Sequence, residues 1–184
     1  LTSGNYEKKQ KHTGGKNGYG GKLANIFSKE FIVETIDHNH GKKYVQRFYN
    51  NMADKDKPKI TSNKGKPYTK ITYYPDFERF GHKKLEDDMI RLITKRTYDA
   101  AAVTDPSVNI FLNDKKLEFK SFEKYTDLYL GDKTEVPRLY QDFSSRWAIC
   151  IAVNPTQQFE QVSFVNGITT YQGGKHVEYI TNQV

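Results

Sequence analysis

Short runs of apolar residues in the first half of the chain have the character of half-buried strands. They lie at residues 31–36, 44–49 and 68–74. The first run is rich in β-branched residues and the other two alternate apolar with polar positions, so each predicts a strand. The polar stretch 37–42 predicts a turn that joins the first two strands as an antiparallel hairpin. Ahead of them, Leu23, Ile26 and Phe27 have helical spacing and predict a short helix over 22–28.

A lysine-rich stretch at 53–67 separates the second and third of these strands. It contains two prolines and few apolar residues. Because proline and charge clusters interrupt regular structure, this stretch predicts a loop.

The clearest helical pattern of the chain covers 84–102. Leu85, Met89, Leu92 and Ile93 form an apolar stripe along it. Acidic residues come early in this segment and basic residues later, as the helix dipole favours. We therefore predict one long amphipathic helix here.

Further hairpins and short helices are predicted after Asp105-Pro106. Strand patterns at 108–112 and 116–119 flank the turn residues Asn113-Asp114. The spacing of Phe122, Tyr125, Leu128 and Tyr129 predicts a short amphipathic helix. The runs 147–153 and 161–165 predict a strand pair around Asn154-Pro155, and a last helix should start near His176.

This order of elements predicts an α+β fold in two units. Each unit combines a mostly antiparallel sheet with helices on one face. The change in pattern near residues 104–106 places the boundary there, giving domains 1–104 and 105–184.

Charge and cysteine content narrow the classes of function. The chain of 184 residues carries 29 Lys and Arg against 22 Asp and Glu, a net charge of +7. This excess favours contact with a polyanion such as DNA or RNA, or simply keeps the protein soluble. The single cysteine, Cys150, excludes an internal disulfide and a cysteine-based zinc site, and its apolar surroundings predict a buried structural thiol.

The termini and the longest apolar run bear on targeting. The run 147–153 is far too short to span a bilayer, and no leader pattern opens the chain. We therefore expect no membrane partner. The first residues read as the middle of a protein, so we expect a fragment.

Three other groups of residues invite a functional interpretation. A basic set consists of Lys42, Lys43, Lys55, Lys57, Lys59, Lys64 and Lys66. These lysines either contact the phosphates of a DNA duplex or cover solvated loops. His38 and His40 lie in a turn and lack a second ligand cluster, so a solvated turn is favoured over zinc. Near Gly173-Gly174, His176 is interpreted as a surface or interface residue and not as a catalytic one.

The most distinctive stretch is a glycine-rich loop at residues 13–22, which reads TGGKNGYGGK. It is not a Walker A loop, because position 16 is Lys16 and the residue after Gly21-Lys22 is Leu23. It is not a dinucleotide fingerprint either, because Leu23 replaces the required glycine and no strand precedes it. The glycines still allow close approach of the backbone to an anion ahead of a helix, which favours phosphate binding over a plain linker.

The loop and its flanks closely resemble the ATP lid of eukaryotic-type DNA topoisomerase II. The resembling segments read SGNY, TGGKNGYGGKLANIFS, FIVET, YTKITYYPDFERF, KRTYDAA and SFVNGITTYQGGKHVEYI. They cover nearly the whole chain in collinear order, and the glycine loop and the last block are both highly specific. The family belongs to the gyrase, Hsp90, histidine kinase and MutL ATPases. The glycine-loop segment resembles the eukaryotic-type sequence more than that of bacterial gyrase or topoisomerase IV. Viral and organellar copies of the eukaryotic type remain possible.

The resemblance implies a fold and a set of nucleotide-binding residues. The fold would be the C-terminal part of a Bergerat-type ATPase domain, followed by part of a ribosomal-protein-like β-α-β transducer domain. The residues that match the nucleotide-contacting segments are Ser3, Gly4, Asn5, Gly15, Lys16, Asn17, Gly18, Tyr19, Gly20, Gly21 and Lys22. Lys16 stands where animal enzymes usually carry arginine, and Gly21 where they usually carry alanine. Lysine keeps the charge but loses the planar fork.

The resemblance also implies an activity for the parent protein. This would be a type II DNA topoisomerase that uses ATP and Mg²⁺ to pass one DNA duplex through a transient double-strand break. Its partners would be double-stranded DNA and a second copy of itself, and its location the nucleus. The family's catalytic glutamate, magnesium ligand and DNA-cleaving tyrosine match no residue here, so the fragment alone should be inactive, with no catalytic or metal-ligating residue. The alternative is a non-catalytic basic DNA- or protein-binding module of the same fold.

Overall fold

The computed structural model of this chain describes residues 15, 17–144 and 146–184. Ser3, Gly4, Asn5 and Lys16 lie outside the described residues. Contacts divide the described chain into two compact units, which meet in the sequence between Glu86 and Asp87. Each unit combines helices with antiparallel strands, so the fold is α+β. The expected domains 1–104 and 105–184 differ from this division, because they leave the helix that begins at Asp87 with the first domain.

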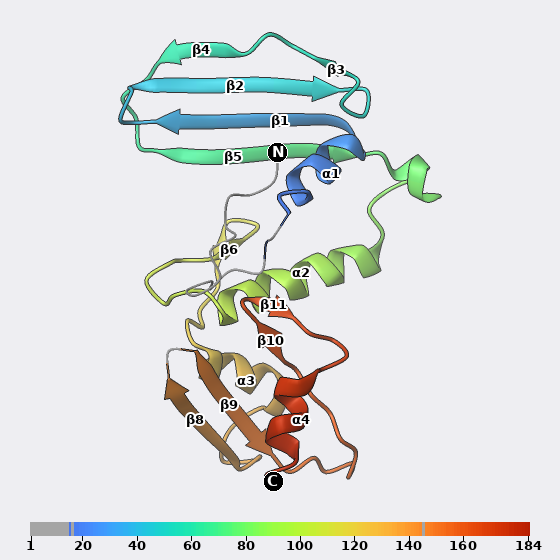
Figure 1. The fold of residues 1–184 in the computed structure, drawn as a ribbon, viewed down its shortest axis with the longest axis vertical. Helices are drawn as coiled ribbons and strands as arrows, with labels where there is room; N and C mark the ends of the chain where they lie inside the picture. Colours follow the sequence, from blue (N-terminus) through green and yellow to red (C-terminus); the bar gives the residue numbers. More distant parts are fainter. Residues whose placement is uncertain (1–14, 16, 145) are drawn as a thin grey trace. The chain divides into compact units, whose positions relative to one another are not determined.

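The first unit is built around one sheet (Figure 1). Strand β1 (Ser28–Asp37) lies between β2 (Lys42–Tyr49) and β5 (Tyr68–Pro75), and it pairs with both in antiparallel fashion. The predicted hairpin and third strand are therefore confirmed. The hairpin register pairs Asp37 with Lys42, so the turn covers residues 38–41.

Short helices flank the ends of these strands. Helix α1 (Gly20–Ile26) leads into β1, close to the helix predicted over 22–28. A 3-10 helix, η2 (Phe77–Phe80), follows β5 and was not predicted. The rings of Phe27 and Phe80 meet with their centroids 5.3 Å apart, which brings the two helical segments together.

The loop predicted over 53–67 is wrong in part, because it contains two strands. Strands β3 (Asp54–Lys55) and β4 (Lys59–Ser62) both pair with the outer edge of β2, as Figure 1 shows. Backbone hydrogen bonds along an open strand edge need no apolar pattern. A lysine-rich segment can therefore pair there, and charged residues are typical of such edges.

The second unit begins with α2 (Asp87–Ala102), which confirms the long predicted helix apart from its first turn. Its partner is α3 (Phe122–Leu130), the short amphipathic helix expected around Tyr125. Between them, β6 (Phe111–Leu112) and β7 (Lys115–Lys116) form a small ladder. Asn113 and Asp114 adopt positive φ angles of 49° and 64°, as a tight hairpin turn requires.

The strand pairing predicted after residue 146 is wrong. Strand β9 (Trp147–Ala152) pairs with β8 (Arg138–Ser144), which was not predicted. The segment 161–165 contributes β10 (Phe164–Val165) to a separate hairpin with β11 (Ile168–Thr169). The physical reason is the Asn166-Gly167 turn, because its positive φ angles of 51° and 78° return the chain after two residues.

The last helix, α4 (Lys175–Thr181), starts one residue before the predicted His176. The core of the second unit is aromatic. Tyr125 is only 2% exposed, and its ring meets Phe122 and Phe164 at centroid distances of 6.2 and 5.9 Å. Helix α3 thus packs on the β10–β11 hairpin through rings, which bury large areas per residue.

Candidate functional site

The described residues of the glycine loop form an open turn that ends at α1. Gly18 has a φ of 65°, a conformation that favours glycine, and Tyr19 is the residue ahead of the helix. Among the residues that the structure describes, a Cβ placed on Gly15, Gly20 or Gly21 would meet nothing within 4 Å. The glycines therefore leave open space beside the backbone, into which an anionic group can approach.

Two side chains of the loop lie beside this space. The ammonium of Lys22 is 6.0 Å from the centroid of the Tyr19 ring, so cation and ring attract each other. Tyr19 is 54% exposed and Asn17 is also exposed. Asn17, Tyr19 and Lys22 thus lie with the described glycines in the loop and the first turn of α1, and their contact with phosphate stays a prediction.

The far end of α1 is fixed to the sheet. Asn51 donates through Nδ2 to the Ile26 carbonyl at 3.0 Å and to Asp76 Oδ2 at 3.1 Å. The backbone N–H of Asp76 donates to the Phe27 carbonyl at 2.9 Å, and Ser28 Oγ donates to the Ala24 carbonyl at 2.5 Å. These contacts hold the exit of the loop in place while its glycines face open space.

Asn25 lies inside this anchored turn. It is 6% exposed, and its Oδ1 accepts no hydrogen bond from the residues that the structure describes. Because a buried acceptor without a partner costs free energy, the carbonyl is positioned to accept from an N–H or a water.

The last resembling block covers residues 163–180, and hydrogen bonds join its turn to Gln161 and connect residues within it. Gln161 Nε2 donates to the Tyr171 carbonyl at 2.9 Å, and Thr170 Oγ1 lies 3.2 Å from His176 Nε2. Gly174 has a φ of 145°, and a Cβ on it would stand 3.3 Å from the His176 ring. Glycine is therefore required where the chain turns into α4, and His176 is engaged by Thr170.

A buried carboxylate joins this block to two helices. Asp99, on α2, is 4% exposed. Its carboxylate accepts from Tyr125 on α3 at 2.6 Å and from Thr169 on β11 at 3.0 Å. It also accepts from Lys95 at 2.9 and 3.0 Å. We call these four side chains the Asp99 cluster.

The electrostatics of the Asp99 cluster favour the charged carboxylate. Burial on its own would raise the pKa of Asp99, but the hydrogen bonds from Tyr125, Lys95 and Thr169 outweigh it and lower that pKa below its usual value. Burial and the neighbouring carboxylate both raise the pKa of Tyr125, so its hydroxyl keeps the proton that it donates.

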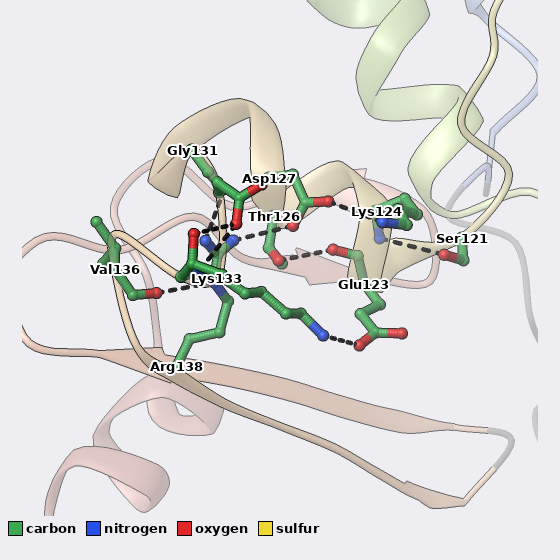
Figure 2. Close-up of polar contacts among 11 residues, drawn as sticks. Ser121, Glu123, Lys124, Thr126, Asp127, Gly131, Lys133, Val136 and Arg138 are labelled. Atoms are coloured by element: carbon green, nitrogen blue, oxygen red, sulfur yellow. Dashed lines mark hydrogen bonds and ion pairs between the residues drawn. The ribbon is translucent and has the colours of Figure 1, made fainter.

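A second ion pair, with one buried partner, lies below α3 (Figure 2). The side chain of Arg138, on β8, is fully buried and donates to Asp127 at 3.0 Å and to the Gly131 carbonyl at 2.6 Å. Lys133 pairs with Glu123 beside it. These contacts tie the 131–136 loop to the helix and the strand.

The histidine turn and the single cysteine were considered as metal-binding or catalytic candidates, and the structure shows their contacts. His40 pairs with Asp37 in the β1–β2 turn at 2.5 Å, and this contact lowers the pKa of Asp37. Across the described ranges, no group of acidic, histidine and cysteine side chains is arranged to hold a metal ion. Cys150 is a free thiol, and it is half-buried where full burial was predicted. Within those same ranges, each helix is too short or too polar to cross a bilayer.

Sequence reasoning missed the buried charges of both ion pairs, Asp99 and Arg138. Asp99 left a signal, because an acidic residue near the C-terminal end of an amphipathic helix opposes the helix dipole. Arg138 left none that we recognise, since its strand was itself not predicted.

Comparison with known proteins places the glycine loop and the last block in one family. Residues 108–184 match the family model described as DNA gyrase B. The whole chain aligns with the DNA topoisomerase 2 of Arabidopsis thaliana at 48% identity, covering 13% of that protein. It superposes on the crystal structure of the ATPase region of Saccharomyces cerevisiae topoisomerase II with a TM-score of 0.89 and 47% identity. The chain belongs to the eukaryotic-type DNA topoisomerase II family.

A further topoisomerase II structure extends the comparison. The ATPase and transducer domains of DNA topoisomerase II from Balamuthia mandrillaris superpose with a TM-score of 0.89 and 40% identity, over all of this chain and 47% of theirs. The yeast ATPase region is likewise covered to 48% of its length, so the chain spans about half of each solved region. The predicted family and α+β fold class are confirmed.

Proposed function

We propose that the full-length protein is an ATP-hydrolysing type II DNA topoisomerase and that this chain forms part of its ATP-operated clamp. The observation that supports this most is the alignment of the entire chain with the ATPase region of a topoisomerase II. In this proposal, residues 1–104 are part of a Bergerat-type ATPase domain and residues 105–184 part of a transducer domain. The full-length enzyme passes one duplex through a transient break in another.

The glycine loop is the proposed grip on the triphosphate of ATP. Its residues with this role are Ser3, Gly4, Asn5, Gly15, Lys16, Asn17, Gly18, Tyr19, Gly20, Gly21 and Lys22. The open space beside the glycines and the charge of the lysines suit phosphate oxygens. In this proposal Mg²⁺ accompanies the nucleotide and binds its phosphate oxygens.

The partners follow from the same family membership. We propose double-stranded DNA as substrate, a homodimer as the working form and the nucleus as the location. Binding of ATP closes the two N-terminal regions around a duplex, and hydrolysis resets them through the transducer.

Nucleotide binding by the full-length protein tests the proposed site. Lys22→Gln removes a charged donor, whose hydrogen bond to phosphate contributes about 1.5–3 kcal/mol. We therefore expect the Kd for ATP, measured by calorimetry, to rise by roughly tenfold or more.

Lys84→Gln is the matched control, because it makes the same charge change at an exposed position outside the loop. Its Kd should equal that of the unmodified protein. Unchanged ATP affinity in Lys22→Gln, or equal losses in both variants, would contradict the assignment.

A further inference from the structure

The positive charge of the chain is concentrated in one segment. Residues 42–70 contain nine Lys and Arg against two Asp. Their net charge of +7 equals the net charge of all 184 residues. The remainder of the chain therefore has as many acidic as basic residues. Such concentration creates a local positive potential that a uniformly basic surface of the same net charge lacks.

Six lysines of this segment lie along or beside the outer edge of the first unit's sheet, and we call them the lysine edge. They are Lys42, Lys55, Lys57, Lys59, Lys64 and Lys66. Strands β3 and β4 run along β2 (Figure 1). In the register, Lys55 lies opposite Phe48 and Lys59 opposite Val45. The register spans the eight residues of β2, which corresponds to about 23 Å of strand.

Hydrogen bonds hold the other end of the lysine edge in place. The backbone N–H of Asn63 donates to the Gly41 carbonyl at 2.8 Å, and Asn63 Oδ1 accepts from the Gly65 N–H at 2.7 Å. Lys42 pairs with Ser62 in the register. Lys64 and Lys66 are thus carried on a loop that is tied beside Lys42.

The acidic residues of the segment are engaged with the sheet, and the lysines are not. Asp54 accepts from Asn50 Nδ2 at 2.6 Å, and Asp56 lies 3.9 Å from the guanidinium of Arg47. All six lysines of the edge are exposed, and within the described part of the chain they make no ion pair. Their charge is therefore directed to solvent and to any anionic partner.

We propose that the lysine edge binds the sugar–phosphate backbone of a DNA duplex. Its length of about 23 Å matches about seven base pairs, at 3.4 Å of rise along each strand. A charged edge also prevents strand-to-strand aggregation. A flexible ammonium contacts phosphate without reading bases, so the binding is independent of sequence. This inference rests on the proposed function, which makes duplex DNA the substrate.

Lysine footprinting of the full-length protein tests the proposal residue by residue. An amine-reactive acetylating reagent is applied with and without a saturating linear duplex, and modification is read by mass spectrometry. We expect the duplex to lower the reactivity of Lys55, Lys57 and Lys59. Equal reactivity with and without the duplex at these three positions overturns the proposal.

The salt dependence of duplex binding provides the second measurement. A plot of the logarithm of the DNA association constant against the logarithm of salt concentration has a negative slope. Replacing Lys55, Lys57 and Lys59 by Gln should make this slope less steep by roughly 2.7, at about 0.9 for each lost phosphate contact. The control replaces Lys115, Lys116 and Lys120 by Gln, an equal charge change at exposed positions of the second unit. An unchanged slope in the edge variant, or an equal loss in the control, overturns the proposal.

The unmodified protein distinguishes this inference from the proposed function. If it passes duplexes with ATP but the edge lysines stay unprotected, only the proposed binding of DNA by the lysine edge is wrong. If it passes no duplex at all, the proposed function fails.

Discussion

Asp99 shows how a single residue organises the second unit. Its carboxylate accepts hydrogen bonds from Tyr125 on α3 and from Thr169 on β11. Positive charge comes from Lys95 at 2.9 Å and from Arg96 at 3.8 Å, both on its own helix. A buried charge is tolerated only when such partners are present. The position of α2 against α3 and the β10–β11 hairpin therefore depends on this one side chain.

Removing the carboxylate should loosen these elements. We expect Asp99→Ala to lower the free energy of local opening by about 3–5 kcal/mol, because Lys95 and Tyr125 lose their buried partner. Hydrogen exchange of α2 and α3 amides in the full-length protein measures this opening.

Asp88→Ala is the matched control, since the side chain of Asp88 is 93% exposed and pairs only with Arg91 in the described structure. An exposed pair contributes at most about 1 kcal/mol. Equal exchange in the two variants would show that the Asp99 cluster does not hold the helices.

The lowered pKa of Asp99 predicts a pH dependence. A carboxyl whose pKa is lower in the folded state stabilises the fold above its unfolded pKa of about 3.9, and the stabilisation is lost as pH falls through the folded value. Protection of α2 should therefore be constant near neutral pH and fall in acid below about pH 4.

Asp99→Asn removes this titration while keeping an acceptor oxygen. The difference in protection between the variant and the unmodified protein should shrink as the pH falls through the folded pKa of Asp99. A difference that persists unchanged in acid would contradict the role of the charge.

At the scale of elements, α3 is the helix on which the second unit is assembled. It contacts α2 and β9, and its aromatic residues pack on the β10–β11 hairpin. Its start is defined by Ser121, whose Oγ accepts from the Lys124 N–H at 3.1 Å (Figure 2). The helix therefore begins with a side-chain cap that satisfies one of its free N–H groups.

Ser121→Ala should destabilise α3 by about 1 kcal/mol, because the capping acceptor is lost. Hydrogen exchange of the first turn of α3 reports the change. Ser121→Asp restores an acceptor and should restore the protection. Loss of protection in Ser121→Asp equal to that in Ser121→Ala would mean that the cap is not the cause.

Local pattern was enough to predict some elements and not others. The β1–β2 hairpin, β5, α2 and α3 were predicted because burial of one face imposes a period on their residues. Strands β3 and β4 were missed because an edge pairs through its backbone, whatever its side chains. The wrong partner of β9 came from choosing between distant segments, a choice that depends on tertiary packing and on the Asn166-Gly167 turn.

Some features of the candidate site follow from local sequence, and others depend on the tertiary fold. The glycine loop is predicted to bind phosphate from its own residues, since such a site needs glycines and lysines at close spacing, and this role stays a prediction. The Asp99 cluster joins residues 95, 99, 125 and 169, and no local pattern links them. Such contacts become visible only when the fold brings the elements together.

The whole molecule places these features within a larger protein. The chain covers 13% of the Arabidopsis topoisomerase 2 and 48% of the yeast ATPase region. The first unit carries the glycine loop and the lysine edge, and the second carries the Asp99 cluster. In our account, ATP acts on the first unit and the second relays its state to the rest of the enzyme.

The separation of interlinked duplex circles by the full-length protein tests most directly whether it is an ATP-driven type II topoisomerase. Intact catenated circles come apart only if one duplex passes through a double-strand break in the other. We predict separation when ATP and Mg²⁺ are present, none without ATP, and a strong reduction in Lys22→Gln. Separation that proceeds without ATP, or its absence under all conditions, would contradict the account.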